Sequence, residues 1–299
     1  MQILVVGGSG MIGGHAALHL AASGHEVTIA SRNPPAEATP MSALAFLQGD
    51  YVAGSFKTAD LARFDALVFA AGQDPRHLRK GDDAAALWER ANVEAVPRFF
   101  AQAREAGVRR AVNIGSFYPQ AAPRLMAGNP YILSRHRVDE AVRALCTPDF
   151  GVVCLNPPYM LGAVPGLGSR AFERLTHYAQ GRVPKIPVFA PTGGVNFMST
   201  RSLAQAIEGA LTRGEPGRAY LVGDRNLSFL DYFTAFFRAV GNTAEIPQLA
   251  QDHPLASSYA GLGGTLYFEP DPAQTELLGY ARDDITRAIE EIVAQYRHP

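Results

Sequence analysis

The sequence predicts an α/β fold built on a doubly wound parallel β-sheet. Three observations support this: recurring apolar runs, a glycine cluster directly after the first run, and a change of composition after residue 156. Helical or loop stretches separate the runs, as crossover connections between parallel strands require. The expected strands are residues 2–6, 26–30, 43–47, 66–71, 110–114 and 151–155.

Composition limits the classes of partner. Of the 299 residues, 47% are hydrophobic and 18% are charged, and the formal net charge is -1. This balance suits a globular core and gives no electrostatic reason to expect nucleic acid or an anionic membrane. No apolar segment is long enough to span a bilayer, and Cys146 and Cys154 lie among apolar residues, as reduced packing cysteines do. We therefore expect a cytoplasmic protein that binds a small-molecule substrate, with no nucleic-acid or membrane partner.

The first expected strand leads into a glycine-rich turn and then a helix over residues 11–22. Glycines let the backbone turn tightly and approach a pyrophosphate, whose charge then lies at the helix N-terminus. Gly8, Gly10 and Gly13 fit G-x-G-x-x-G, whereas Gly7, Gly10 and Gly13 fit G-x-x-G-x-x-G, so spacing leaves both registers open. The turn predicts a Rossmann-like dinucleotide site with contacts from Gly7, Gly10, Met11, Ile12 and Gly13.

The second strand ends in Ala30-Ser31-Arg32-Asn33. An NAD-binding protein usually has Asp or Glu there, against the ribose 2′-hydroxyl. Arg32 stands at this place, and a guanidinium suits bidentate contact with a 2′-phosphate. We therefore expect NADP as cofactor, with NAD as the alternative; the other interpretation of Arg32 is a solvated loop charge.

Further candidate cofactor contacts follow the third and fourth strands. Asp50 and Tyr51 come directly after the third strand, where the Asp50 carboxylate either accepts a hydrogen bond from an adenine amino group or serves as a turn residue. The fourth strand ends in the small residues Ala70, Ala71 and Gly72. Small side chains there would let the nicotinamide-side ribose lie against the strand end.

Two long helices are expected next. Residues 82–106 carry Pro97 in the middle, where the missing N–H and the proline ring predict a kink. A second helix begins near Asn129-Pro130 and extends to residue 147. After residue 156, prolines and glycines become frequent, which predicts an irregular lobe over the carboxyl edge of the sheet. Later helices are expected over residues 201–213, 228–240 and 283–296.

We divide the chain into a dinucleotide-binding domain, residues 1–156, and a mixed substrate-binding lobe, residues 157–299, with some segments returning to the sheet. Aromatic side chains of the lobe either line an apolar substrate pocket or, for most of them, pack its core. These are Tyr159, Phe172, Tyr178, Phe189 and Phe197.

The chain contains eight histidines. None is spaced with cysteines or carboxylates as metal ligands are, so we expect no metal site and treat all eight as surface or helix residues. They are His15, His19, His25, His77, His136, His177, His253 and His298.

A further candidate constellation is Ser116 after the fifth strand with Tyr131 and Arg135 in the following helix. Tyr131 and Arg135 are four residues apart and so share a helix face. With the glycine turn, this order resembles the short-chain dehydrogenase/reductase superfamily, specifically its extended branch of nucleotide-sugar epimerases, dihydroflavonol reductases and 3β-hydroxysteroid dehydrogenases. Other similar stretches are Phe69-Ala70-Ala71-Gly72, Asn92, Leu155-Asn156-Pro157-Pro158 and Gly194-Val195-Asn196-Phe197-Met198.

The resemblance implies roles for these residues. Ser116 would hydrogen-bond the substrate oxygen, Tyr131 would exchange a proton with it, and hydride would pass to or from nicotinamide C4. Pro158 would contact the cofactor after the sixth strand, although Asn156 replaces the usual Arg of that motif. The family's Lys, which binds the ribose hydroxyls and lowers the pKa of the catalytic phenol, is replaced by Arg135.

The charge and the acidity of the arginine determine what this replacement changes. A fixed cation about 5 Å from a phenolate, at an effective dielectric near 20, supplies on the order of 3 kcal/mol. Arg135 can supply this term but does not readily release a proton. Reduction tolerates that loss better than oxidation, because the phenol then starts protonated and acts as the acid. The sequence therefore favours a reductase.

Two other departures bear on activity. The stretch Ser116-Phe117-Tyr118-Pro119 lacks the acid pair that dehydratases of the family carry there, so elimination has no evident acid and base. Gly115 stands where a second hydroxyl is common in the family, so one hydrogen-bond donor to a substrate oxyanion is missing.

Three functions therefore remain open. The first is an NADP-dependent oxidoreductase acting on a carbonyl or secondary alcohol. The second is a nucleotide-sugar epimerase, which would need cations in the lobe to bind the substrate diphosphate. The candidates are Arg170, Arg174, Arg182 and Lys185; the other interpretation is that these are solvated helix charges. The third is a non-catalytic NADP-binding regulator, with Arg135 and Gly115 as marks of a decayed site. The resemblance also implies a homodimer through the helices near residues 82–106 and 130–147.

Overall fold

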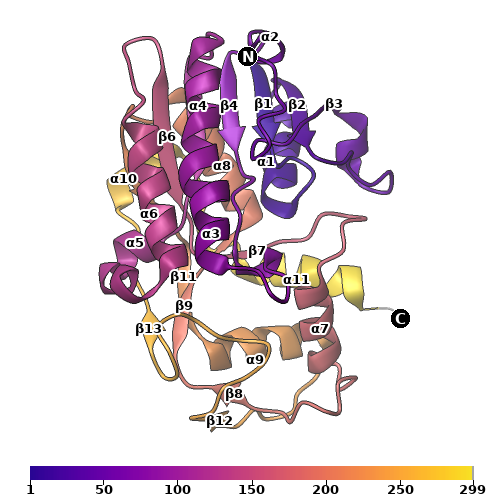
Figure 1. Cartoon of the computed structure of the whole chain (residues 1–299). Helices are drawn as coiled ribbons and strands as arrows, with labels where there is room; N and C mark the ends of the chain where they lie inside the picture. Colours follow the sequence, from indigo (N-terminus) through magenta and orange to yellow (C-terminus); the bar gives the residue numbers. More distant parts are fainter. Residues whose placement is uncertain (298–299) are drawn as a thin grey trace.

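A computed structural model describes residues 1–297, apart from the side chain of Arg76. Its main feature is a seven-stranded sheet in the order β10-β6-β5-β4-β1-β2-β3, with every neighbouring pair parallel (Figure 1). This confirms the predicted Rossmann-like α/β fold. The strands are β1 (Gln2–Val6), β2 (Glu26–Ser31), β3 (Ala45–Gln48), β4 (Ala66–Phe69), β5 (Arg110–Ile114), β6 (Gly151–Asn156) and β10 (Ala219–Leu221).

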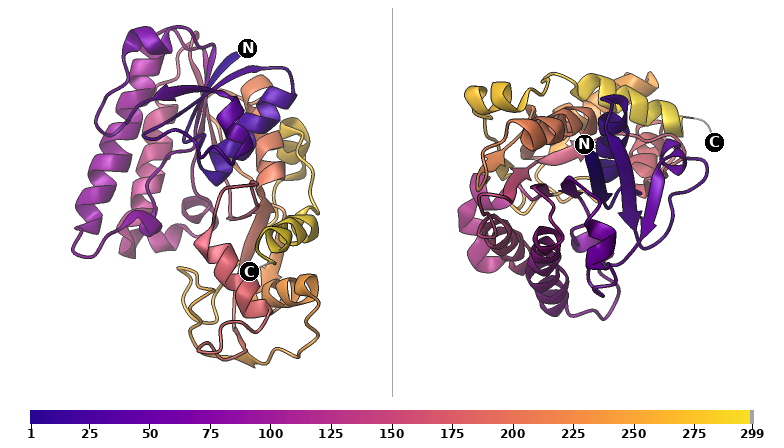
Figure 2. Two further views of the ribbon diagram at one scale, coloured as in Figure 1. Left: turned by 90° about the vertical axis from the view of Figure 1, so that its right-hand side faces the viewer. Right: turned by 90° about the horizontal axis from the view of Figure 1, so that it is seen from above.

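Helices cover both faces of the sheet (Figure 2). Side chains alternate along β1, so Ile3 and Val5 pack with α1 (Met11–Ala22) and α8 (Thr200–Thr212), while Leu4 and Val6 pack on the opposite side. That opposite side is covered by α4 (Ala95–Glu105) and α6 (Pro130–Arg143). Shorter helices are α2 (Thr58–Leu61), α3 (Ala84–Trp88), α5 (Tyr118–Ala121) and α10 (Pro272–Leu278).

The helix predicted over residues 82–106 is interrupted before the proline. Helix α3 leads into a π-helical segment, Glu89–Glu94, and α4 then carries Pro97. Proline cannot donate to the carbonyl four residues earlier and its ring crowds that carbonyl, so the chain widens in the preceding turn. The expected disturbance is therefore present, but as a π turn upstream of Pro97.

The second half of the chain contains a second, smaller sheet. Its central strand β9 (Gly194–Ser199) pairs with β11 (Arg225–Ser228), β13 (Thr265–Leu266) and β7 (Tyr159–Leu161). Three helices pack around it, α7 (Arg170–Ala179), α9 (Phe229–Val240) and α11 (Ile285–Tyr296), and a further strand pair is formed by β8 (Ala190–Pro191) and β12 (Gln248–Leu249). This lobe lies beyond the carboxyl ends of β1 and β4 to β6 (Figure 1). It is more regular than predicted, because short strands and α7 lie among the prolines that suggested loops.

His253 contradicts the prediction of a surface or helix residue. Its ring is buried among Tyr178, Phe189 and Phe233, with centroid distances of 5.2, 4.8 and 4.8 Å. Nδ1 accepts the Leu255 N–H at 3.2 Å, and burial lowers the histidine pKa to about 4, so the ring is neutral near pH 7. His298 lies outside the described residues.

Three further findings concern classes of protein and site. Within residues 1–297, no helix combines the length and apolar character that crossing a bilayer requires. Across the same part of the chain, no three His, Cys, Asp or Glu side chains group as metal ligands would. Both cysteines are free thiols, with Cys154 buried and Cys146 half-buried.

Candidate active site

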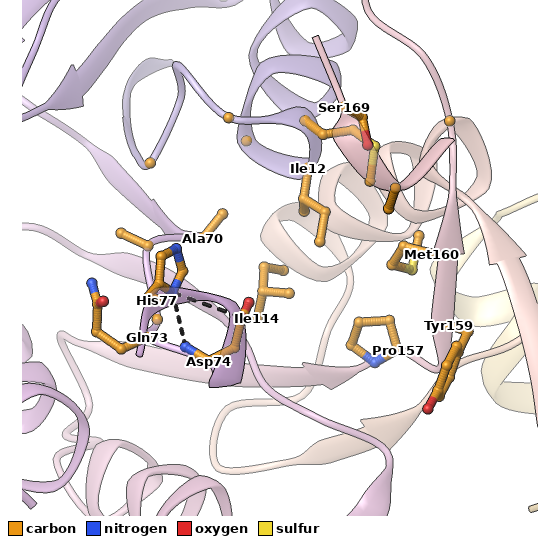
Figure 3. A pocket seen from close by; sticks show the side chains of 18 of the residues that line it. Ile12, Ala70, Gln73, Asp74, His77, Ile114, Pro157, Tyr159, Met160 and Ser169 are labelled. Carbon is orange, nitrogen blue, oxygen red and sulfur yellow. Dashed lines mark hydrogen bonds and ion pairs between the residues drawn. The ribbon is translucent and has the colours of Figure 1, made fainter. Parts of the chain in front are cut away.

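A crevice of about 1640 Å³ runs along the carboxyl ends of the central strands, with the lobe as its other wall. Figure 3 shows side chains from both parts facing it, including Ile12 at the start of α1, Ile114 at the end of β5 and Pro157 after β6. Open α/β sheets bind ligands at this edge. The crevice is lined by Gly7, Gly10, Met11, Ile12, Gly13, Arg32, Asp50, Tyr51, Ala70, Ala71, Gly72, Ser116, Tyr131, Arg135 and Pro158, which are all the site residues predicted from the sequence.

The glycine turn is sterically required at Gly7, Gly8 and Gly13. Gly7 has a φ of 85°, and a Cβ there would lie 2.8 Å from the Ala70 carbonyl. A Cβ at Gly8 would lie 2.5 Å from Ile29, and one at Gly13 would overlap the Gly7 carbonyl oxygen. Helix α1 then begins at Met11, and its N-cap residue Gly10 has no side chain to cap it, so the first N–H groups and the positive end of the helix dipole face the crevice.

Arg32 and Asp50 mark the crevice wall beside β2 and β3. The Arg32 side chain is exposed. The Asp50 carboxylate accepts the Val52 N–H at 2.8 Å and the Ala53 N–H at 3.4 Å, so it shapes its own turn. Tyr51 is buried, its hydroxyl donates to the Ala71 carbonyl at 3.1 Å, and burial raises its pKa. Tyr51 therefore fixes the end of β4.

Arg135 is buried at the ends of β4 and β5. One of its terminal nitrogens, Nη2, donates to the Ile114 carbonyl at 2.6 Å. A Cβ at Gly72 would overlap the other, Nη1, so the missing side chain at Gly72 makes room for the guanidinium beside the end of β4. Its Nε is buried, and no described residue forms a hydrogen bond with it. A buried unpaired donor beside a crevice suits a ligand oxygen, and this fits the hydroxyl-bearing ribose of a nicotinamide cofactor.

Ser116 is held by a buried polar network. Its N–H donates to Oδ1 of Asn156 at 3.1 Å, and Nδ2 of Asn156 donates to Asp139 at 3.0 Å and to Gln120 at 2.8 Å. Asp139 also accepts from Arg143 at 2.6 Å. Both the oxygen and the nitrogen of the Asn156 side-chain amide are therefore hydrogen-bonded at the end of β6, and the oxygen fixes the backbone of Ser116.

Tyr131 lies in the first turn of α6, which begins at Pro130 with Asn129 as a side-chain cap. Its ring contacts Trp88 at 5.4 Å and Tyr259 at 6.2 Å between centroids. Asn92 supports the same region, because its amide exchanges hydrogen bonds of 3.0 and 3.1 Å with the backbone of Gln73. Nδ2 of Asn92 also donates to Oγ of Ser134 in α6 at 3.4 Å, so the π turn ties α6 to the end of β4.

Aromatic residues that sequence reasoning did not select form the other end of the crevice. Phe117, Tyr118 and Tyr259 join Tyr131 and Tyr159 there. The position of Phe117 and Tyr118 directly after Ser116 was the available signal; nothing local marks Tyr259. Of the aromatic set predicted for the lobe, Tyr159, Phe172 and Phe197 line the crevice, while Tyr178 and Phe189 pack in the core.

One cation of the lobe reaches the described wall of the crevice. Arg170, at the start of α7, lines it. Arg174, Arg182 and Lys185 are not among the described lining residues.

Comparisons with known proteins agree with this architecture. Residues 3–223 match the model of the NAD dependent epimerase/dehydratase family. No curated protein matches the sequence. The fold is similar to UDP-glucose-4-epimerase from Stenotrophomonas maltophila, solved with NAD and formylated UDP-arabinopyranose, at 19% identity and a TM-score of 0.77 over 99% of this chain and 98% of that chain.

A second similar structure is UDP-glucose 4-epimerase from Bifidobacterium longum, solved with NAD+ and UDP. It is 16% identical, with a TM-score of 0.75 over 99% of this chain and 98% of that chain. Identities this low show the shared fold, whereas the family match spans most of the sequence. The chain therefore belongs to the NAD-dependent epimerase/dehydratase family.

Proposed function

We propose that this chain is an NADP-dependent oxidoreductase that works as a reductase on a carbonyl compound. The observation that carries the proposal is that Ser116, Tyr131 and Arg135 line one crevice together with the glycine turn. A hydroxyl, a phenol and a buried cation are the groups that reduction of a carbonyl requires beside a hydride donor.

The residues that would hold NADP are the start of α1, Arg32 after β2, and Arg135 in α6. The N–H groups at the start of α1 would bind the pyrophosphate, and the exposed Arg32 guanidinium would bind the 2′-phosphate. The unpaired Nε of Arg135 would donate to a ribose hydroxyl. Bound NADPH supplies the hydride that the carbonyl carbon receives.

The protein side of the reaction is proton delivery. Ser116 would donate a hydrogen bond to the substrate oxygen and so orient the carbonyl. The Tyr131 phenol would give its proton to that oxygen as negative charge develops there, which leaves an alcohol and a phenolate that takes a new proton from water. The Arg135 cation would stabilise the phenolate without taking part in the proton transfer, because a guanidinium does not deprotonate in proteins.

Calorimetry tests the cofactor part of this proposal. We expect NADPH to bind at least tenfold more tightly than NADH, since each good contact of a guanidinium to phosphate is worth about 1.5–3 kcal/mol. Arg32→Ser should remove the preference, whereas Arg182→Ser, an exposed arginine outside the described crevice wall, should keep it. Tighter binding of NADH to the natural protein would contradict the assignment to NADP.

Turnover tests the chemical part. A matched ketone and alcohol should show faster reduction with NADPH than oxidation with NADP+, and Tyr131→Phe should abolish both. Tight NADPH binding with no turnover of any carbonyl compound, together with an unchanged phenotype in the Tyr131→Phe variant, would favour a regulatory NADP-binding protein.

A nucleotide-sugar epimerase is the second candidate. Arg170 on the crevice wall and the fold shared with UDP-glucose 4-epimerases favour it. Incubation with UDP-glucose, followed by chromatography of the sugar nucleotides, tests it directly. Formation of an epimer at a rate above that of carbonyl reduction would replace the reductase proposal.

A further inference from the structure

Five aromatic side chains surround the part of the crevice between α5, α6 and the lobe. We name them the aromatic box: Phe117, Tyr118, Tyr131, Tyr159 and Tyr259. Their rings contact one another in a continuous series, with centroid distances of 4.2 Å for Phe117–Tyr118, 5.1 Å for Tyr118–Tyr259, 6.2 Å for Tyr131–Tyr259 and 6.1 Å for Phe117–Tyr159. The box therefore includes Tyr131, the proposed proton donor, in its own wall.

No member of this box is acidic or basic, although Arg135 lies one helical turn from Tyr131, and burial together with the Asp74 charge raises the pKa of Tyr259. Arg32 follows β2 and Asp50 follows β3, while Arg135 lies in α6 against Gly72. Asp74 and His77 belong to the loop after β4 (Figure 3). Arg170 is the remaining acidic or basic residue of the described crevice wall. Burial raises the pKa of Tyr118 and of Tyr159, so both phenols stay neutral. A dianionic diphosphate would find one cation on the lobe side, whereas an uncharged ring finds a matching apolar wall.

The hydrogen bonds inside the box fix which groups it offers. The Tyr159 hydroxyl donates to the Ser257 carbonyl at 2.8 Å, and that carbonyl can only accept. Tyr159 has one hydrogen, so the 2.9 Å contact between the Tyr118 and Tyr159 oxygens must be a donation from Tyr118. The hydrogens of Tyr118 and Tyr159 are thus used, so these two phenols offer a ligand only acceptor lone pairs, while Tyr131 keeps its role as proton donor.

We propose that the aromatic box binds an uncharged aromatic carbonyl compound that carries a hydroxyl on its ring. The ring packs on the box, the carbonyl lies toward Ser116 and Tyr131, and the ring hydroxyl donates to the oxygen of Tyr118 or Tyr159. The inference rests on the proposed reductase function, and it adds the class of substrate to it.

Calorimetry with protein saturated with NADP+ tests the binding part. The probes are p-hydroxyacetophenone, p-methoxyacetophenone, cyclohexyl methyl ketone and UDP-glucose. We expect p-hydroxyacetophenone to bind roughly three- to tenfold more tightly than its methyl ether, which cannot donate, and more tightly still than the non-aromatic ketone. Equal affinity for the phenol and its ether would overturn the hydroxyl assignment, and tighter binding of UDP-glucose would overturn the substrate class.

Tyr118→Phe supplies the matched test within the protein. This variant keeps the ring and the Tyr159–Ser257 bond but removes one of the two candidate acceptors, and Tyr159→Phe removes the other. Loss of whichever oxygen accepts the ring hydroxyl should reduce the preference for the phenol over the ether to about twofold or less. Tyr267→Phe removes a hydroxyl from an exposed tyrosine outside the described crevice wall and should leave the preference unchanged. An unchanged preference in Tyr118→Phe, together with an unchanged preference in Tyr159→Phe, would contradict the proposed contact.

The binding and turnover results separate the two proposals. If the phenol binds as expected but NADPH is not consumed, the reductase function fails and the assignment of the box holds. If NADPH is consumed equally well with the cyclohexyl and hydroxyphenyl ketones, the reductase function holds and the aromatic class fails.

Discussion

Gly115 and Asn156 occupy one space at the ends of β5 and β6. A Cβ at residue 115 would overlap Oδ1 of Asn156, the same oxygen that accepts the Ser116 N–H. Gly115 is therefore explained by packing against Asn156. The two departures that the sequence showed separately, a missing hydroxyl at 115 and a missing arginine at 156, are one structural feature.

This pairing predicts strong coupling between the two positions. Gly115→Ala alone should lower the free energy of unfolding by about 2 kcal/mol or more, because the added methyl group meets a buried amide. The same change in an Asn156→Ala background should cost at least about 1 kcal/mol less. Urea denaturation of the four proteins of the cycle measures this difference.

Gly128→Ala is the control for these glycine substitutions, since a Cβ there would meet no atom within 4 Å. It should change the stability by less than about 0.5 kcal/mol. Additive effects of Gly115→Ala and Asn156→Ala would show that the two residues do not share the space.

Arg135 should matter for activity through its charge. Arg135→Lys keeps a cation and should retain reduction within roughly tenfold, whereas Arg135→Gln should lower kcat/KM by about 10- to 100-fold, as loss of a charge-assisted contact does. Oxidation of the matched alcohol should fall further than reduction, because oxidation begins from the phenolate. Steady-state rates in both directions measure this.

Arg137→Gln provides the comparison on the same helix. Arg137 forms an exposed ion pair with Glu89 at 2.6 Å, and such pairs contribute at most about 1 kcal/mol. Rates should stay within twofold of the natural protein. Equal losses in Arg135→Gln and Arg137→Gln would argue against a role for Arg135 in the crevice.

Local patterns predicted the fold well where neighbouring residues determine it. β1 and α1 begin and end where the apolar run, the glycine turn and the helical periodicity indicated. Contacts between distant residues were beyond such patterns: Gly115 and Asn156 meet through strand pairing, and His253 is enclosed by rings from α7 and α9. Tyr259 reaches the crevice from a loop with no periodicity of its own.

His253 predicts loss of stability on mild acidification. Burial lowers its pKa to about 4 from the ordinary value of 6.5, so the unfolded chain binds a proton more readily than the folded one. The contribution is complete above pH 6.5 and is lost as pH falls toward 4, by about 2 kcal/mol between pH 7 and pH 5. Urea denaturation at both pH values should show this loss, and His253→Gln should reduce it by that amount. An equal loss in the variant would place its origin elsewhere.

Arg201 should stabilise the contact between α8 and α11. Its guanidinium pairs with Asp284 at 2.8 Å and with Glu291 at 2.6 Å. Because these groups are partly exposed, Arg201→Met should cost about 1–2 kcal/mol, and less in 1 M salt. Arg287→Met removes a more exposed partner of Glu291 and should cost under about 0.5 kcal/mol. Thermal denaturation at two salt concentrations measures both, and equal effects of the two substitutions would contradict the assignment.

The position of β10 has a consequence for how this protein is made. β10 covers one side of β6 in the sheet, yet it is translated about sixty residues later, after the β9 and α8 segments. In a chain that ends at residue 156, β6 would be an edge strand with an exposed apolar edge. Cys154 and Leu155 would lack the strand pairing that Ala219 and Tyr220 provide in the full chain. We therefore expect residues 1–156 expressed alone to aggregate, and gene fusions that exchange the lobe to need β10 kept with the sheet.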